Sequence, residues 1–335
     1  MNYVFPDICI GYEPIHIEGV VWYDEGVKKV MKQILGWGVG VLLGLVILMW
    51  QQWPDGKLHI VACDVGQGDA ILVEQGFNQV LIDGGPSGEK VLKCLRQEMP
   101  FWDRRIELIV MTHSDFDHIN GLADVIERYS VIEFLSGDGL KMSATLEHLR
   151  EVLANKKIKI EAVEMGDIVR VVDENLGERL RFRVWWPSDV KREKLAILSG
   201  DFGNKGDYQI LGVSAKKGTG QSNNWRSVVL ELKWHNYRAL FTGDADFQAE
   251  KEMLKAGVVE QVNYLKVGHH GSKSSSSLEF LEKLKPKVAV ISVGKHNRYG
   301  HPTKEALERL KKVGAKIRRT DLEGKVEVVV DRGGV

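Results

Sequence analysis

Two histidines and two aspartates lie within the six positions 113–118, which read His-Ser-Asp-Phe-Asp-His. Imidazole nitrogens and carboxylate oxygens together suit a borderline or hard divalent ion such as zinc or manganese. The alternative is a polar turn that caps a helix beginning near Asn120, with these residue types there by chance. More ligand-type residues at two later strand ends favour the metal site.

Each group of ligand-type residues follows an apolar segment typical of a strand. The run Ile106–Met111 ends just before His113 and holds segment 113–118 at the rim of a sheet. The run that begins at Tyr237 stops on Thr-Gly-Asp and places Asp244 at a strand tip. A carboxylate at such a tip is free to bridge two metal ions.

A histidine pair, His269 and His270, follows the apolar run that begins at Tyr264 and breaks at Gly268. Adjacent residues in an extended segment point to opposite sides, so we expect one of the pair to bind metal. We predict His269 as the ligand, because it directly follows Gly268 at the strand end. His270 is then expected to donate to substrate or to support a ligand.

The chemistry expected of such a site is hydrolysis. Divalent ions pull the pKa of bound water toward neutrality and so supply a nucleophile. The sequence has no Ser or Cys nucleophile elbow and no Walker A loop. Two ions about 4 Å apart suit a phosphodiester especially well, because they clamp its attacking and leaving oxygens.

The order of these motifs resembles that of metallo-β-lactamase-fold hydrolases, specifically the branch found as the C-terminal domain of ComEC-type DNA-internalisation competence proteins. The resemblance covers roughly residues 57 to 331 and implies a four-layer αβ/βα sandwich of the α/β class, with the metal site at one edge. It also implies cleavage of one DNA strand during uptake. The segments that carry it are Cys63–Ala70, Leu81–Gly85, His113–Gly121, Asn223–Ser227, Thr242–Asp244, His269–Ser272 and Asn297–Pro302.

The chain departs from the broad superfamily pattern at two points. Asp115 stands where that pattern has a second histidine, as is common in the competence branch, and no Gly-His-Thr segment supplies the usual middle histidine. The first metal position is therefore one neutral ligand short, which favours manganese or magnesium, with zinc and a single-metal site as alternatives. Carried over by position, the ligands are His113 and Asp115 for the first ion, Asp117, His118 and His269 for the second, and Asp244 as the bridge.

Other residues are candidates for work on the substrate. We predict catalytic roles for Asp117, His270 and His301, the last of which would position substrate or donate to the leaving group. The serines of segment 271–277 precede a helix at Leu278–Leu284, where a phosphate could rest, although an ordinary serine N-cap explains them equally well. The candidates for substrate binding or ligand support are Asp64, Asp69, Asp83, Asn224, Ser227, Ser272, Lys273, Ser274, Asn297 and Tyr299.

An uncharged run, Gln33–Trp53, precedes the motifs. Its apolar core, Ile34–Trp50, has the length of a membrane-spanning helix and lacks the amphipathic face of a helix buried in a soluble protein. We therefore expect an N-terminal cytoplasmic segment (1–33), a transmembrane anchor (34–54) and a hydrolase domain (57–331). Lysines 28, 29 and 32 precede the run and only Lys57 follows closely, which predicts a catalytic domain outside the cell membrane.

Composition adds few constraints. The formal net charge of zero excludes a globally basic nucleic-acid binder. Cys9, Cys63 and Cys94 show no metal or redox spacing, and their odd number predicts no disulfide framework. A Gly/Ser/Lys-rich loop, Ser199–Ser222, is either a substrate-binding insertion or a long connection.

The sequence thus predicts a membrane-anchored metal-dependent hydrolase, with a DNA strand as substrate. One candidate span cannot form a DNA-conducting pore. The chain is therefore expected to be a partner of a separate membrane channel, a split version of the larger protein, or a cell-envelope hydrolase that shares only the branch. The alternatives are a hydrolase of a small ester, lactone or phosphodiester at the cell envelope, and a DNA-docking module with reduced catalysis.

Overall fold

The computed structural model describes residues 25–137, 140–172, 179–188 and 223–333. Most of the predicted N-terminal segment, including Cys9, and the predicted loop Ser199–Ser222 lie outside the described residues. The chain divides into two units, residues 1–53 and 54–335, and each is described by itself.

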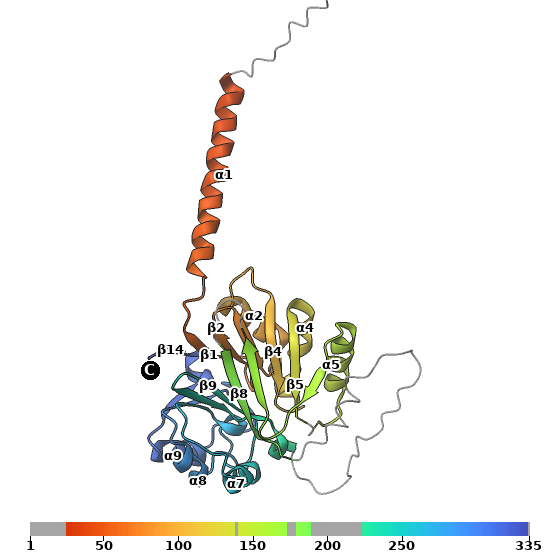
Figure 1. Cartoon of the computed structure of the whole chain (residues 1–335), viewed down its shortest axis with the longest axis vertical. Helices are drawn as coiled ribbons and strands as arrows, with labels where there is room; N and C mark the ends of the chain where they lie inside the picture. The colour runs from red at the N-terminus through yellow and green to blue at the C-terminus, as the bar shows by residue number, and fades with distance from the viewer. Residues whose placement is uncertain (1–24, 138–139, 173–178, 189–222, 334–335) are drawn as a thin grey trace, which may run out of the picture. The chain divides into compact units, whose positions relative to one another are not determined.

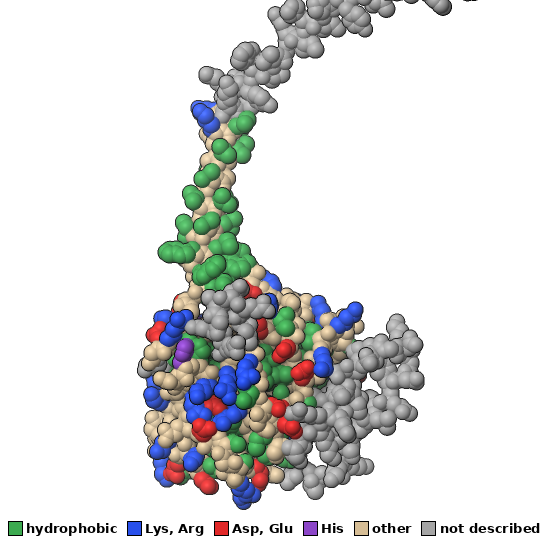
Figure 2. Space-filling view, viewed as in Figure 1, with side chains coloured by type: hydrophobic (Ala, Val, Ile, Leu, Met, Phe, Trp, Pro, Cys, Tyr) green, Lys and Arg blue, Asp and Glu red, His purple; other side chains and the backbone are tan. Residues whose placement is uncertain are grey.

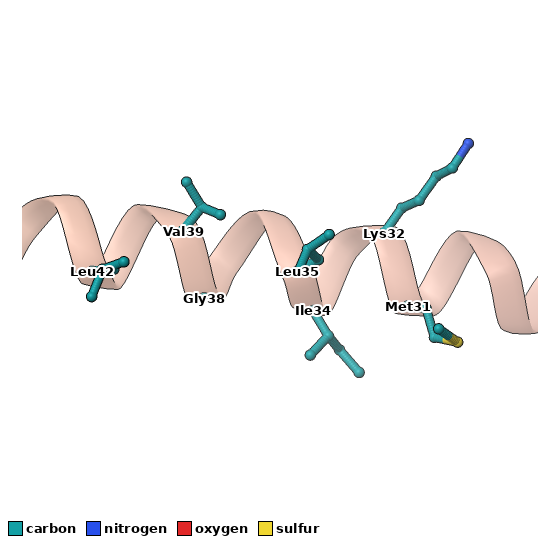
Figure 3. Close-up of a pocket in the computed structure, with 7 residues that line it drawn as sticks. All are labelled: Met31, Lys32, Ile34, Leu35, Gly38, Val39 and Leu42. Atoms are coloured by element: carbon teal, nitrogen blue, oxygen red, sulfur yellow. The ribbon is translucent and has the colours of Figure 1, made fainter.

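The first unit contains one long helix, α1 (Glu25–Gln51). Its stretch Lys29–Gln51 has 23 residues and a mean hydropathy of 2.0, enough to cross a membrane by length and composition. A shallow groove runs along the helix between Met31 and Leu42. The side chains of this stretch project to opposite sides of the helix (Figure 3). The helix is therefore apolar around its circumference, which makes it a candidate membrane span.

The second unit is built on two mixed sheets of seven strands (Figure 1). In spatial order, sheet A contains β14 (Val326–Val330), β1 (Leu58–Ala62), β2 (Ile71–Gln75), β3 (Asn78–Ile82), β4 (Arg105–Met111), β5 (Ser130–Ser136) and β6 (Ile160–Ala162). Sheet B contains β13 (Lys316–Arg319), β12 (Val288–Ile291), β11 (Tyr264–Lys266), β10 (Tyr237–Phe241), β9 (Val229–Trp234), β8 (Arg179–Trp186) and β7 (Ile168–Val172).

The two sheets share one plan. In sheet A, β1, β2 and β3 pair antiparallel, and β3 to β6 then pair parallel. In sheet B, β7 to β10 pair antiparallel, and β10 to β13 then pair parallel. Parallel strands end at the same edge of a sheet, so the residues that follow β3, β4, β10, β11 and β12 gather at one rim of each sheet.

Side-chain alternation along the strands produces three apolar layers. On β4, Leu108 and Val110 join the layer between the sheets, whereas Ile109 and Met111 face the helices outside sheet A. A third layer lies between sheet B and its own helices. The predicted four-layer αβ/βα sandwich is therefore confirmed. The helices on sheet A are α2 (Gly88–Glu98), α4 (Leu122–Arg128) and α5 (Ala144–Asn155), and those on sheet B are α7 (Phe247–Lys255), α8 (Leu278–Leu284) and α9 (Lys304–Lys312). Short turns of helix are α3 (Phe116–Ile119), η1 (Asn223–Arg226), η2 (Gly268–Gly271) and α10 (Thr320–Glu323).

A disulfide joins Cys63 and Cys94, whose Cα atoms are 5.9 Å apart. The expectation that the cysteines form no disulfide framework is wrong, because it rested on their odd number and spacing. The fold brings the pair together: Cys63 follows β1, and Cys94 lies on the face of α2 that packs against sheet A. The bond fixes the start of the loop that carries Asp69.

Candidate metal centre

Six loops converge at the rim where the strands of both sheets end. Sheet A contributes the loops after β1, β3 and β4, and sheet B contributes those after β10, β11 and β12. The predicted residues that these loops bring are Asp69, Asp83, His113, Asp115, Asp117, His118, Asp244, His269, His270, Asn297 and His301.

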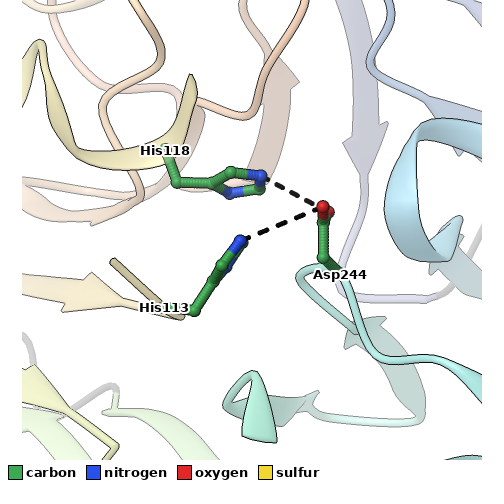
Figure 4. A group of neighbouring side chains, drawn as sticks. All are labelled: His113, His118 and Asp244. Atoms are coloured by element: carbon green, nitrogen blue, oxygen red, sulfur yellow. Dashed lines mark ion pairs between the residues drawn. The ribbon is translucent and has the colours of Figure 1, made fainter. Parts of the chain in front are cut away.

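Asp244 is the centre of this arrangement. Its Oδ1 lies 3.3 Å from His118 Nε2 and 3.5 Å from His270 Nε2. Its Oδ2 lies 3.9 Å from His113 Nε2 and 3.6 Å from His269 Nε2. Figure 4 shows the His113 and His118 rings directed at this carboxylate. The two oxygens thus define an inner side, with His118, His270 and Asp117, and an outer side, with His113, His269 and Asp115.

The backbone before Asp244 requires glycine. Gly243 has φ +49°, and a Cβ there would lie 2.9 Å from the Thr112 side chain. The Asp244 backbone N–H donates to Ser227 Oγ over 3.2 Å, which gives the buried, predicted Ser227 a role in holding the loop. The Thr-Gly-Asp turn therefore brings the carboxylate close against the loop of sheet A.

Both inner-side histidines are held through Nδ1. His118 is fully buried, and its Nδ1 lies 2.8 Å from Asp83 Oδ2. His270 Nδ1 donates to the carbonyl oxygen of Ser292 over 2.9 Å. A neutral ring that donates from Nδ1 presents an unprotonated Nε2, so each ring binds metal once it has lost the second proton. Asp117 completes this side, with its Oδ2 3.4 Å from His270 Nε2.

Asp83 orients His118 and does not itself face the metal centre. Its carboxylate accepts hydrogen bonds from the Thr112 backbone N–H and hydroxyl at 2.8 and 2.6 Å, in addition to its contact with His118. The structure places it in the supporting role, one of the two roles that the sequence leaves open for it.

The outer side is more open. The side chains of Asp115 and His269 are 40% and 28% exposed, whereas that of His113 is buried. Asp115 Oδ2 lies 3.8 Å from His113 Nε2. The predicted Asn224 contacts His269, with its Nδ2 3.1 Å from Nδ1. Solvent and substrate therefore have access from this side.

The structure corrects the expectation for the histidine pair. His269 and His270 have φ of +47° and +52°, so their segment is a left-handed turn and not an extended strand end. The rule of opposite sides does not apply, and both rings face Asp244. His270, not His269, lies beside Asp117 and His118. His269 lies on the outer side, where the sequence left one neutral ligand missing.

The donor set fits a divalent ion. The Nε2 atoms of His113, His118 and His270 and Oδ1 of Asp244 are buried and lack a hydrogen-bond partner within the part of the chain that the structure describes. Buried polar atoms are normally bonded, so four that converge indicate a missing partner of positive charge. Ligand atoms of His113, His118 and Asp244 lie within 4.8 Å of one another, as do those of Asp117, His118 and His270.

Comparison with known proteins agrees with this geometry. The family model described as Metallo-beta-lactamase superfamily matches residues 63–296. The chain belongs to this superfamily. Superfamily membership supports a metal-dependent hydrolase and confirms the resemblance on which the predicted fold rested.

The chain is similar to three named bacterial proteins. ComE operon protein 3 of Bacillus subtilis is 27% identical over 296 residues, which cover 82% of this chain and 33% of that protein. Recombination protein 2 of Haemophilus influenzae is 25% identical, with 86% and 31% covered. Competence protein ComA of Neisseria gonorrhoeae is 27% identical, with 89% and 36% covered. The chain thus spans about a third of the length of these relatives.

Several side chains of the site have pKa values far from their ordinary values. Burial lowers the pKa of His113 to about 3, assisted by the neighbouring His118. Burial alone would lower the pKa of His118 and His270, but the surrounding carboxylates, Asp244 foremost, raise that of His118 well above its usual range and that of His270 to about 9. Burial opposes ionisation of Asp244, yet these histidines hold its pKa well below the ordinary value. The carboxylates of the centre therefore favour positive charge beside them.

Lys266 is a site residue that the sequence interpretation missed. It is the last residue of β11, fully buried, and its Nζ forms an ion pair with Asp69 and donates to the Gly243 carbonyl over 2.9 Å. Nζ also lies 3.9 Å from Asp244 Oδ1. A lysine within an apolar strand was the available signal, because a buried ammonium requires a carboxylate partner. The predicted Asp69 is that partner, and its Oδ1 also lies 3.5 Å from His270 Nδ1.

The loop after β12 forms a rim next to the outer side. Asn297 Nδ2 donates to the His301 carbonyl, and its Oδ1 accepts from the N–H groups of Tyr299 and His301. The rings of His301 and His269 lie 5.5 Å apart, and Tyr299 stacks on His301 at 5.8 Å. Burial lowers the pKa of His301 to about 4, assisted by His269. Asn297 thus shapes the rim that carries His301 and Tyr299.

Four other predicted substrate residues, Asp64, Ser272, Lys273 and Ser274, lie in two of the loops. Asp64 is exposed and accepts a hydrogen bond from Gly66 N–H. In the serine segment, the Ser272 and Ser274 hydroxyls bond each other at 3.0 Å, and Lys273 is exposed. The Ser276 and Ser277 N–H groups at the start of α8 donate to buried Glu250. Since Glu250 already uses these amides, they are not free to hold a phosphate.

Proposed function

We propose that this chain is a metal-dependent phosphodiesterase that cleaves DNA at the cell membrane. One observation carries the proposal: a single buried carboxylate, Asp244, has metal-type donors on both of its oxygens. Two ions on either side of a bridging carboxylate are suited to clamp the attacking and leaving oxygens of a phosphodiester.

The proposed ligands follow the two sides of Asp244. Asp117, His118 and His270 bind on the inner side, and His113, Asp115 and His269 bind on the outer side. Manganese, zinc or magnesium would supply a bound water of lowered pKa there. His269 replaces the middle histidine that the sequence lacks. This set keeps Asp244 as the bridge and four of the other five predicted ligands on their predicted sides, moves His269 to the outer side and adds His270.

The residues at the rim have roles on the substrate. His301 is held neutral by its lowered pKa, and its Nδ1 is buried without a partner within the described residues. We assign it the positioning of the substrate phosphate through a hydrogen bond; the alternative role as proton donor to the leaving oxygen requires a higher pKa in the substrate complex. Tyr299 is 69% exposed and offers a ring on which a base can stack. The names of the competence relatives support DNA as the substrate.

The proposed location is the outer side of the cytoplasmic membrane, with α1 as the anchor. The lysines before α1 favour a cytoplasmic N-terminus. The Cys63–Cys94 disulfide supports the same topology, because disulfides persist in oxidising compartments outside the cytoplasm. A separate membrane channel would then pass the strand that is not degraded.

The test uses the full-length protein in detergent micelles, stripped with chelator and supplied with manganese, magnesium or zinc. Labelled single- and double-stranded DNA serve as substrates. We expect cleavage to return with metal and to be lost in Asp117→Asn. Asp331→Asn removes the same charge at an exposed position and should cleave like the parent protein.

Two outcomes would overturn the proposal. Cleavage that persists in Asp117→Asn would show that Asp117 is not a ligand that the reaction needs on the inner side. Bound metal with no cleavage of any DNA would move the function to a small ester, lactone or phosphodiester, or to DNA docking with reduced catalysis.

A further inference from the structure

The outer face of sheet B is apolar at one end and charged at the other. Near the metal centre, Val229 and Leu240 pack in the layer under α7 and α8. Toward the other end of the same strands, the exposed positions are occupied by arginine and lysine. Figure 2 shows these basic side chains gathered on the face of the molecule where Figure 1 places β8 and β9.

Four of the basic residues form a row across neighbouring strands, which we call the basic ladder. Arg170 on β7 pairs in register with Arg181 on β8, Arg181 with Lys233 on β9, and Lys233 with Arg238 on β10. Residues directly opposite each other lie on the same face of a sheet. The ladder is therefore a line of four cations, each about 4.8 Å from the next strand.

Such a row opposes folding, because like charges opposite each other destabilise a sheet. Arg238 is compensated by ion pairs to Glu231 and Glu260, which also hold Arg183. Arg170, Arg181 and Lys233 are exposed and form no ion pair within the described part of the chain. The segment 173–178, whose sequence carries three acidic residues, lies outside that part.

We infer that the basic ladder binds the sugar-phosphate backbone of a DNA strand, at a distance from the metal centre. Its linear form complements a linear polyanion, as does the positive charge of Arg170, Arg181 and Lys233, which no ion pair within the described residues compensates. The identity of the polyanion rests on the function proposed above. Arg238 precedes Asp244 by six residues along β10 and its end, so the Arg238 end of the ladder lies at most about 20 Å from the bridging residue along the chain. A strand of sufficient length contacts both places at once.

The experiment measures binding without cleavage. Full-length protein in nanodiscs of zwitterionic lipid is kept in chelator and titrated into fluorescein-labelled oligothymidine while anisotropy is recorded. The test variant is Arg170→Gln/Arg181→Gln/Lys233→Gln. For an oligonucleotide of about 20 residues, we expect it to bind roughly tenfold more weakly, with a salt dependence shallower by about 2 in log–log slope, since each phosphate contact on a single strand contributes about 0.7.

Three controls accompany the titration: a variant that loses the same charge elsewhere, a shorter oligonucleotide, and a measurement of thermal unfolding. Lys93→Gln/Arg96→Gln/Lys156→Gln removes the same charge from exposed helix positions on the sheet A side and should bind like the parent protein. An oligonucleotide of about 3 residues has too few phosphates to contact the whole ladder and should show a smaller difference in affinity between the two triple variants. The ladder variant should unfold at the same or a higher temperature, because it loses cross-strand repulsion.

Equal binding of the long oligonucleotide by the parent protein and the ladder variant would overturn the inference. If anionic lipid were the partner, that equality would appear in zwitterionic nanodiscs, and the ladder variant would lose only association with phosphatidylglycerol vesicles. Loss of cleavage with intact ladder-dependent binding would remove the proposed nuclease function and leave the ladder in place.

Discussion

The two sides of Asp244 use the same residue types and differ in how tightly the fold holds them. On the inner side, His118 and His270 are buried, and each has a fixed acceptor on Nδ1, Asp83 Oδ2 and the Ser292 carbonyl. On the outer side only His113 is buried, and His269 and Asp115 are partly exposed, as is Asp117 on the inner side. Orientation before binding strengthens a metal site, so we expect the inner side to bind more tightly and the outer side to adapt to substrate.

A buried ion pair next to the inner side also balances its charge. Lys266 and Asp69 form a buried pair that touches both the Gly243–Asp244 loop and His270. No described cation occupies the corresponding place behind His113. From this difference we expect the inner position to hold its ion more permanently than the outer position.

The largest effect is expected from the residue that the two sides share. Asp244→Asn removes the negative charge from both positions and should abolish tight binding of metal at each. We expect any hydrolytic activity to fall by at least about 1,000-fold. Metal content after dialysis checks this, with Asp331→Asn as the exposed control. Retention of one full equivalent of metal would show that Asp244 does not join the two sides.

The second effect concerns the buried pair behind the inner side. Lys266→Met leaves the Asp69 carboxylate buried without its cation and should lower the free energy of unfolding of the metal-free protein by about 3–5 kcal/mol. The double variant with Asp69→Asn should recover most of this loss, because neither charge then remains. Urea unfolding followed by tryptophan fluorescence measures both. If the Lys266→Met protein were as stable as its parent, the Lys266–Asp69 pair would not stabilise the inner side.

The neighbouring histidines provide a direct contrast between the sides. His270→Ala should lower the affinity of the tighter position by at least about 100-fold, whereas His269→Ala should weaken only the looser one, by about tenfold. Isothermal titration with manganese resolves the two. Equal effects of the two substitutions would mean that the sides are equivalent.

The smallest effect is expected from orientation alone. Asp83→Asn keeps the size of the side chain that holds His118 and should weaken inner-side affinity by about 10- to 100-fold, with less effect on the outer side. Glu327→Gln is the matched control. Glu327 Oε1 lies 2.8 Å from His59 Nδ1, the same distance, and neither residue belongs to the loops of the metal centre. An unchanged affinity in Asp83→Asn would show that burial alone orients His118.

The fold was predicted from a resemblance in the order of motifs, and the apolar runs that end in ligand-type residues at β4, β10 and β11 are part of that order. Parallel pairing brings the ends of these runs together in the structure. Where the prediction failed, the cause was local backbone. The left-handed turn at His269 and His270 depends on contacts of Gly268 and Gly271 with distant segments, which one sequence does not reveal.

Two other features required the folded structure. Lys266 stands in an apolar run, and its partner Asp69 lies almost 200 positions earlier in the chain, so the pair is visible only in space. Cys63 and Cys94 are 31 residues apart, and only the return of α2 along sheet A makes them neighbours. By contrast, the roles of Asp117, His301 and the six predicted ligands stay predictions until metal is seen.

Anomalous diffraction from manganese-loaded crystals tests the central claim most directly. The account predicts two peaks that flank the Asp244 carboxylate, with higher occupancy beside His118 and His270 than beside His113 and His269. A peak on the outer side alone, or no peak in contact with Asp244, would contradict it.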